Sequence, residues 1–110
     1  EGIGGYPVGT KVYRALLTQT GTSAPVATVL QNTLGGTVVM GYSSTATYTG
    51  TLTGVFTALK TMARLTYGDK VAAQSDPYAS RTSNDVVTFG DSSGADGKLV
   101  NAVLEIIVFI

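Results

Sequence analysis

The chain has 110 residues, no net charge and only 13% charged side chains, a length that suits a single domain. It contains no Cys and no His, which excludes disulfide bonds, thiolate or imidazole metal sites, and the Ser-His-Asp and Cys-His catalytic arrangements. A neutral chain also lacks the basic surface of a nucleic-acid-binding protein, and no apolar run reaches the roughly 18–20 residues of a membrane-spanning helix. We therefore expect neither nucleic acid nor a membrane as a partner.

The composition indicates a protein made of β-strands. Thr and Val favour strands, and the 14 glycines supply the tight turns that join them. Soluble proteins usually carry about a quarter charged residues, roughly twice the fraction in this chain. We therefore expect part of the surface to be buried against other copies or another chain. The alternative is a surface that Thr and Ser hydroxyls keep solvated.

The first residues are rich in Gly, and we interpret residues 1–9 as an arm or linker and residues 10–110 as one domain. Because the chain starts at Glu1 without an initiator Met, we expect it to be processed or part of a longer protein. The first strand is predicted over residues 10–19. Neither of its faces is cleanly polar, so we expect it to be buried on both sides or to lie near a subunit contact.

Turn signals divide the next part of the chain. Pro25 precedes a strand predicted over residues 26–31, and Gly35-Gly36 predicts a hairpin-like turn into residues 37–40. Thr then alternates with other residues from Thr45 to Thr53, which predicts one nine-residue strand. Its Thr face is expected to meet solvent or a neighbouring subunit, because an ice-binding surface would need several such strands side by side.

Weaker patterns follow. Residues 62–67 are predicted to form a strand, with a short helical turn over residues 57–64 as the alternative. Residues 68–84 are interpreted as mainly loop, with a short strand near Val71, and residues 85–89 as another strand. Asp96-Gly97 predicts a hairpin before a long last strand over residues 98–110. About seven or eight short strands at this spacing predict an antiparallel β-sandwich, with a small β-barrel as the alternative.

The last predicted strand carries a continuous apolar face. An exposed edge of this kind would aggregate, so we expect the strand to be central in a sheet or part of a subunit contact. The candidate oligomer interface therefore consists of Val100, Leu104, Ile106, Val108 and Ile110. Glu105 lies within the same strand and, if buried, would need a partner such as Arg14 or Arg64.

No constellation in the sequence indicates catalysis. The acidic turn from Asp91 to Asp96 lacks the closing Glu of a calcium loop, and the glycines lack the Lys-Ser/Thr ending of a phosphate loop. Most acidic residues fall in predicted turns, whereas a glycan depolymerase would need two carboxylates that face each other across a cleft. We therefore predict no catalytic residue, no metal site, no cofactor and no enzymatic activity.

A ligand site, if the chain has one, is expected in the polar loop from Asp69 to Asn84. Loops carry specificity on rigid β-scaffolds, and tyrosines provide aromatic faces on which sugars stack. The candidate ligand-contacting residues are Asp76, Tyr78 and Arg81, and the candidate ligand is a glycan.

Several short motifs follow one another along the chain. They are Lys-Val-Tyr at residues 11–13, Leu-Leu-Thr-Gln at 16–19, Gly-Thr-Ser-Ala-Pro at 21–25, Asn-Thr-Leu-Gly-Gly at 32–36, Tyr-Thr-Gly-Thr-Leu-Thr-Gly-Val-Phe at 48–56 and Leu-Glu-Ile-Ile-Val at 104–108. With these motifs the chain resembles a structural domain of phages and prophages of the Bacteroidetes group. It departs from the family pattern over about residues 60–96 and at Met40, where the family often has an aromatic residue.

The resemblance implies a non-enzymatic component of the virion surface, such as a fibre, appendage or capsid-decoration domain. It implies a homo-oligomer, with a trimer favoured, that contacts other virion proteins and is assembled in the cytoplasm of the host bacterium. The alternative is a receptor- or glycan-binding module at a fibre tip, which would contact a host-surface glycan. The motif residues belong to predicted strands and turns, so the resemblance brings no site residues.

Overall fold

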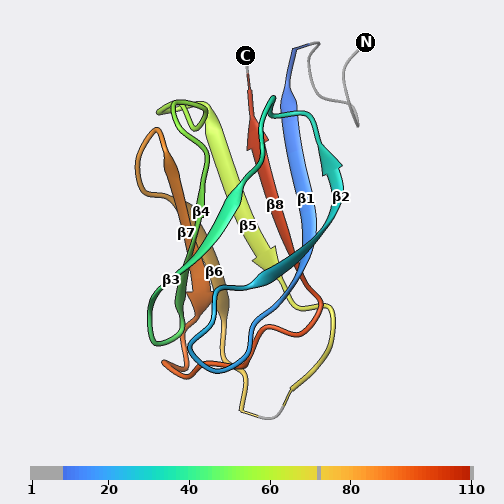
Figure 1. Ribbon diagram of the computed structural model, residues 1–110, viewed down its shortest axis with the longest axis vertical. Coiled ribbons are helices and arrows are strands. Elements are labelled where there is room, and N and C mark those ends of the chain that lie inside the picture. The colour runs from blue at the N-terminus through green and yellow to red at the C-terminus, as the bar shows by residue number, and fades with distance from the viewer. Residues whose placement is uncertain (1–8, 72, 110) are drawn as a thin grey trace.

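The fold is an antiparallel β-sandwich, as the strand pattern predicted. A computed structural model describes residues 9–71 and 73–109 and places eight strands in two four-stranded sheets that pack face to face (Figure 1). The strands are β1 (Lys11–Thr18), β2 (Val26–Asn32), β3 (Val39–Ser44), β4 (Thr47–Thr51), β5 (Thr61–Thr66), β6 (Pro77–Arg81), β7 (Val86–Asp91) and β8 (Ala102–Val108). Sheet A has the order β2-β1-β8-β5 and sheet B the order β3-β4-β7-β6. The two sheets do not close into a barrel, so the alternative fold is wrong.

The core forms because alternate residues of each strand face the opposite sheet. In β1 these inward residues are Tyr13, Ala15 and Leu17, all fully buried. Sheet B contributes Tyr48 and Phe89, whose rings lie 6.0 Å apart between their centroids. On β8, Leu104, Ile106 and Val108 belong to the same core, so this part of the expected apolar face meets the opposite sheet.

Two predicted elements differ from the structure: the Thr-rich strand is interrupted, and the predicted loop contains a strand. The Thr alternation does not form one nine-residue strand, because a turn at Thr45 and Ala46 separates β3 from the five-residue β4. Ala46 has a φ of 61° there, a left-handed conformation that a non-glycine residue rarely adopts. β6 lies within the segment interpreted as mainly loop, while no strand forms at Val71.

Two turn predictions are also wrong. Gly35-Gly36 and Asp96-Gly97 were expected to close hairpins, but each lies between strands of different sheets. These segments are crossovers from β2 to β3 and from β7 to β8. The strand predicted over residues 62–67 forms as β5 (Thr61–Thr66), whereas the alternative helical turn over residues 57–64 is limited to a turn at residues 58–60.

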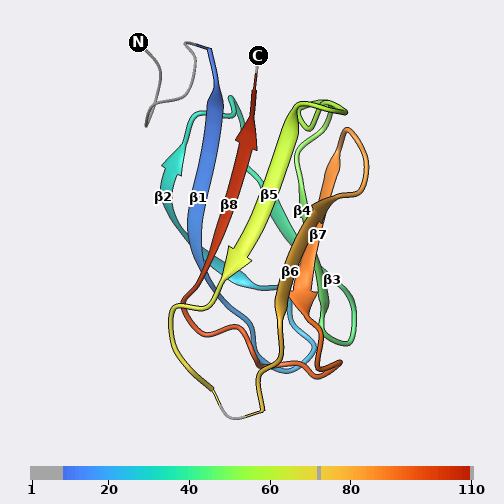
Figure 2. The same ribbon diagram turned by 180° about the vertical axis from the view of Figure 1, so that it is seen from behind.

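The two lateral sides of the sandwich differ. On one side β5 packs against β6 across the gap between the sheets, and Figure 2 shows these strands next to each other from behind. On the other side the border strands are β2 and β3, and no comparable contact joins them in the described part of the chain. The sandwich is therefore closed along β5 and β6 and open along β2 and β3.

The two poles of the sandwich differ as well. Lys11, at the start of β1, pairs with Val108, at the end of β8, so the chain enters and leaves the sandwich at one pole (Figure 1). The loops that lead into β2, β6 and β8 lie at the opposite pole. Among the described residues, no helix has the length and apolar character to cross a membrane.

Candidate functional site

A row of four polar side chains crosses the outer face of sheet A. Glu105 is central and only 5% exposed, and it pairs in register with Arg14 on β1 and Arg64 on β5. Arg14 Nε donates to Glu105 Oε2 at 2.5 Å, and its Nη1 donates to Gln31 Oε1 on β2. Arg64 Nε lies 2.9 Å from Glu105 Oε1, close enough for an ion pair although its N–H does not point at that oxygen.

This row explains how an apolar strand tolerates a carboxylate. A buried charge is costly unless it is paired, and here both arginines that the sequence suggested as partners contact the same carboxylate. The contacts tie β1, β8 and β5 together from the outside of sheet A. We interpret the row as a structural feature.

A second polar cluster surrounds Asp96 near the pole of the crossover loops. Its carboxylate accepts hydrogen bonds from the Ala46 N–H and from the hydroxyls of Tyr42 and Tyr48, each at 2.8 Å. The Tyr48 hydroxyl also lies 2.9 Å from Oε1 of the buried Gln19, so its single proton faces two acceptors. The cluster joins the end of β1, β3, β4 and the β7–β8 crossover.

These contacts change the pKa values of the groups involved. Burial raises the pKa of Asp96, but the three hydrogen bonds that its carboxylate accepts outweigh burial and hold the pKa below its usual value. Burial and the bond to Asp96 raise the pKa of Tyr48. Both groups therefore keep their ordinary ionisation states at neutral pH, with Asp96 charged and Tyr48 protonated.

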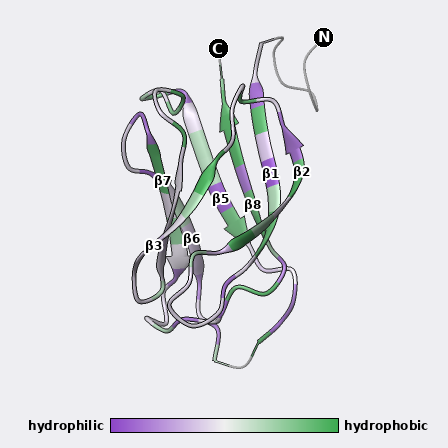
Figure 3. Ribbon diagram, in the orientation of Figure 1, coloured by the Kyte–Doolittle hydropathy of each residue, from purple (hydrophilic) through white to green (hydrophobic). Residues whose placement is uncertain are grey.

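The most exposed apolar side chains lie mainly on the open side of the sandwich. Of the seven large hydrophobic residues exposed on the described surface, four belong to β2 and β3; they are Val26, Val29, Leu30 and Val39. Figure 3 shows the hydrophobic colour on these two strands. Val29 pairs with the core residue Ala15 and so shares the inner side of sheet A, yet it is 51% exposed. The core therefore reaches the surface at this side, which we call the β2–β3 edge.

The edge strands on the closed side carry the features that normally prevent association. Free strand edges can pair with other chains, and proteins block this with charged residues and Pro. β5 contains Arg64, and β6 contains Pro77 and Arg81. β2 and β3 contain neither a charged residue nor Pro. A bulge interrupts the β1–β2 ladder at Leu30, but residues 26–29 pair regularly.

Three of the five residues predicted to form the oligomer interface lie in the core of the sandwich. Leu104, Ile106 and Val108 point into the core of the chain's own sandwich and are almost fully buried. They are therefore not available as a surface for a second subunit, because β8 is an interior strand of sheet A. Val100 is partly buried before β8, and Ile110 lies outside the described residues.

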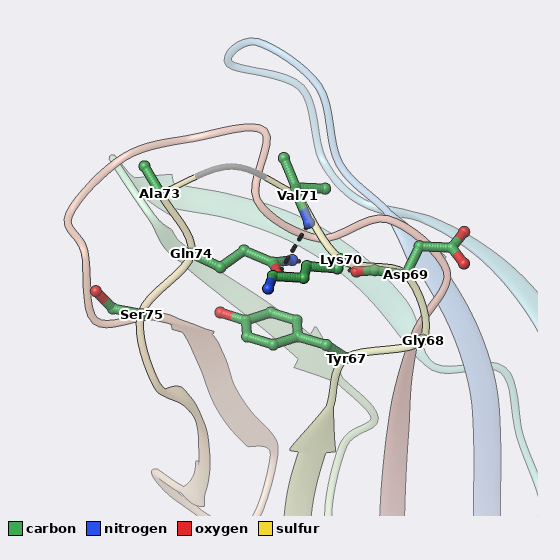
Figure 4. Close-up of a pocket in the computed structure, with 8 residues that line it drawn as sticks. All are labelled: Tyr67, Gly68, Asp69, Lys70, Val71, Ala73, Gln74 and Ser75. Carbon is green, nitrogen blue, oxygen red and sulfur yellow. Dashed lines mark hydrogen bonds between the residues drawn. The ribbon is translucent and has the colours of Figure 1, made fainter.

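A pocket of about 470 Å³ lies in the loop between β5 and β6 (Figure 4). The Tyr67 ring forms one wall, and the side chains of Lys70 and Gln74 lie beside it. Asp69, Val71 and Ser75 also line the pocket. The sequence marked this segment only as a polar loop, and the aromatic residue at its start was assigned to a strand.

The residues proposed to contact a ligand do not line this pocket. Tyr78 lies on β6, where its hydroxyl is 3.3 Å from that of Thr47. Arg81, at the end of β6, donates from Nε to the Phe56 carbonyl at 2.6 Å, so its guanidinium secures a turn. Asp76 is exposed next to the Ser92 hydroxyl, which accepts from the Asp76 N–H. The structure does not bring these three side chains together around the pocket.

The described residues contain no group of three or more acidic side chains that could hold a metal ion. Comparisons of the chain with protein-family models, with curated proteins and with solved structures gave no match. The functional argument therefore uses the chain's own surfaces.

Proposed function

We propose that this chain is a structural domain of a phage virion surface that associates with copies of itself. The β2–β3 edge is the observation that carries the proposal, because it exposes core-like side chains on strands without protective charges. The motif resemblance to phage structural domains and the low charge content support the same conclusion.

A second copy of the chain is the occupant that fits this edge. Neither edge strand carries a charge, so two copies can approach through these strands without like-charge repulsion. Pairing of residues 26–29 with an edge strand of a neighbour would satisfy free backbone groups and cover Val29. Contact between two β2 strands would give a dimer, and contact of β2 with the neighbour's β3 would allow a closed ring such as a trimer.

Replacing Leu30 with Lys tests the surface. Leu30 is 59% exposed, so the substitution leaves the folded monomer intact, but in the assembly it would bury an unpaired ammonium. We expect light scattering to give a multiple of the 11.3 kDa chain mass for the wild type and the single chain mass for Leu30→Lys.

Leu59→Lys is the matched control, because Leu59 is fully exposed outside β2 and β3. This variant should keep the wild-type mass. A wild-type chain that is monomeric at high concentration, or equal masses for both variants and the wild type, would contradict self-association through the β2–β3 edge.

The virion role has its own test. Mass spectrometry of particles purified from a bacterium that carries the gene should detect the chain in fixed proportion to the major capsid protein. Absence of the chain from such particles would refute the virion role while leaving the result of the light-scattering experiment unaffected.

A further inference from the structure

The free edge of β2 offers backbone hydrogen-bonding groups as well as apolar side chains. β2 is a border strand of sheet A and, among the described residues, pairs with β1 alone. In an antiparallel ladder, alternate residues turn their N–H and C=O groups toward one neighbour, and the residues between them turn theirs away. Free groups of this kind are the ones that an added strand binds.

The hydrogen bonds of β1 show which residues of β2 have free backbone groups. The Val12 carbonyl accepts from the Thr33 N–H and the Val12 N–H donates to the Thr33 hydroxyl, each at 2.8 Å. The register of β1 with β8 is unbroken, so all even-numbered residues of β1 face β2. Two of their partners on β2 are Val26 and Thr28, which therefore face β1. The residues that turn their backbone groups away from the sheet are Ala27 and Val29.

Two features limit the free edge to these two residues. Before it, Pro25 has no N–H to donate. After it, the bulge at Leu30 shifts the alternation, so that Gln31 faces β1 although it is odd-numbered. The free edge, which we call the β2 window, is therefore symmetric about Thr28, with one free residue on each side.

We propose that the β2 window binds the β2 window of a second copy in an antiparallel pair centred on Thr28. This inference rests on the proposed self-association and specifies its geometry. Ala27 of each copy lies opposite Val29 of the other, and the two residues exchange N–H···O bonds in both directions. Every free backbone group of the window then has a partner, and the contact closes as a two-fold dimer in which the two A sheets join into one.

Other registers of the two strands satisfy fewer backbone groups. A slip of one residue would set free groups opposite groups that are already bonded to β1. A slip of two residues one way would set Val29 opposite Pro25, which cannot donate. A slip of two residues the other way would set Ala27 opposite Gln31, which faces its own β1. The centre at Thr28 is the one that pairs the whole window.

The same register covers the exposed apolar side chains of β2. It brings Val26 of each copy opposite Leu30 of the other, and both are more than half exposed in the single chain. Val29 lies opposite the smaller Ala27, so the pair fits without two large side chains in contact. β2 carries no charge that would oppose the contact. β3 is the weaker partner, because it contains a glycine and only one of the exposed apolar residues of the β2–β3 edge.

A single cysteine at position 28 tests this register, because the chain has no Cys of its own. In the proposed pair the two Thr28 residues face each other as a non-hydrogen-bonded pair, about 4.5 Å apart between their Cα atoms, within the range of a disulfide. Under mild oxidation Thr28→Cys should form a disulfide-linked dimer of twice the 11.3 kDa chain mass on non-reducing gels.

Val26→Cys is the matched control. Val26 is exposed and lies on the same face of the same strand, but the two copies of residue 26 would be roughly 14 Å apart, too far for a disulfide. This variant should keep the single chain mass on the same gel. Hydrogen exchange gives a backbone readout: the Ala27 and Val29 amides should exchange about tenfold more slowly in the wild type than in Leu30→Lys.

The outcomes separate this geometry from self-association itself. No cross-link in Thr28→Cys, equal cross-linking of the two cysteine variants, or equal exchange of the window amides in the wild type and Leu30→Lys would each overturn the register. A wild-type trimer would overturn it as well, since a ring needs contact between β2 and β3, but would leave self-association standing. A monomeric wild type would overturn both proposals. Unfolding midpoints close to that of the wild type under reducing conditions would establish that both cysteine variants are folded.

Discussion

At the residue scale, two carboxylates are held by donors from several strands. Glu105 contacts arginines of both neighbouring strands on sheet A, and Asp96 accepts three hydrogen bonds near the crossover loops. In each case the carboxylate lies where an uncompensated charge would be costly. Substitutions that remove the charge of either carboxylate should therefore lower the free energy of unfolding.

Replacing Glu105 with Gln should lower the free energy of unfolding by about 1–3 kcal/mol. The estimate lies below the full cost of breaking a buried pair because Arg14 and Arg64 are partly solvated. Arg64→Gln should cost no more than about 1 kcal/mol, since its side chain is 67% exposed. Urea unfolding of both variants measures the difference, and equal losses would show that the carboxylate is not the centre of the row.

Asp96 predicts how stability depends on pH. Its folded pKa lies below the unfolded value of about 3.9, so its contribution to the free energy of unfolding is complete above that value. The contribution is lost as the pH falls through the folded pKa, because the unfolded chain takes up the proton first. Asp96→Asn should therefore be less stable than the wild type at neutral pH and lose less stability on acidification.

Urea midpoints across the acidic range measure this dependence. Asp76→Asn is the control, because the exposed Asp76 carboxylate accepts no hydrogen bond among the described residues and its removal should leave the stability at neutral pH unchanged. Parallel stability curves for the wild type and Asp96→Asn would contradict the role of Asp96.

At the element scale, sheet B depends on a close approach between β7 and the β3–β4 turn. A Cβ atom at Gly90 would lie 1.9 Å from the carbonyl oxygen of Ala46, and both groups belong to the backbone. The turn cannot move freely, since the Ala46 N–H is bonded to Asp96. Gly90 therefore permits β7 to pass next to the turn.

Gly90→Ala should destabilise the fold by more than about 2 kcal/mol, because strands must shift to relieve a backbone clash. Gly94→Ala provides the comparison: Gly94 has a φ of 77° but open space around its Cβ position, so only the cost of the strained backbone, about 1 kcal/mol, is expected. Thermal unfolding of both variants gives the ranking. A smaller effect at Gly90 than at Gly94 would refute the argument.

The sequence pattern predicted most strands because alternation records which side chains face the core. It failed at the β3–β4 turn, since Ala46 adopts a left-handed conformation that Ala does not signal. It missed β6 because Pro77 and polar residues hide a short edge strand. The partners of Glu105 were predicted, whereas the pocket was not, because it depends on how Gln74 folds the loop over Tyr67.

At the scale of the whole molecule, the β2–β3 edge and the pocket between β5 and β6 lie in different directions. The β2–β3 edge runs along one side of the sandwich, and the pocket lies at the pole of the crossover loops. An assembly built through the edge would therefore leave the pocket of every copy open.

The pairing of Lys11 with Val108 has a mechanical consequence. β1 and β8 are antiparallel neighbours, so a load applied between Lys11 and Val108 pulls at the same end of both strands. Such a load breaks the ladder of hydrogen bonds one at a time, like a zipper, instead of shearing all of them at once. A domain suspended by this end should open at low force, whereas pushing or gripping it along the β2–β3 edge would leave the ladder unloaded.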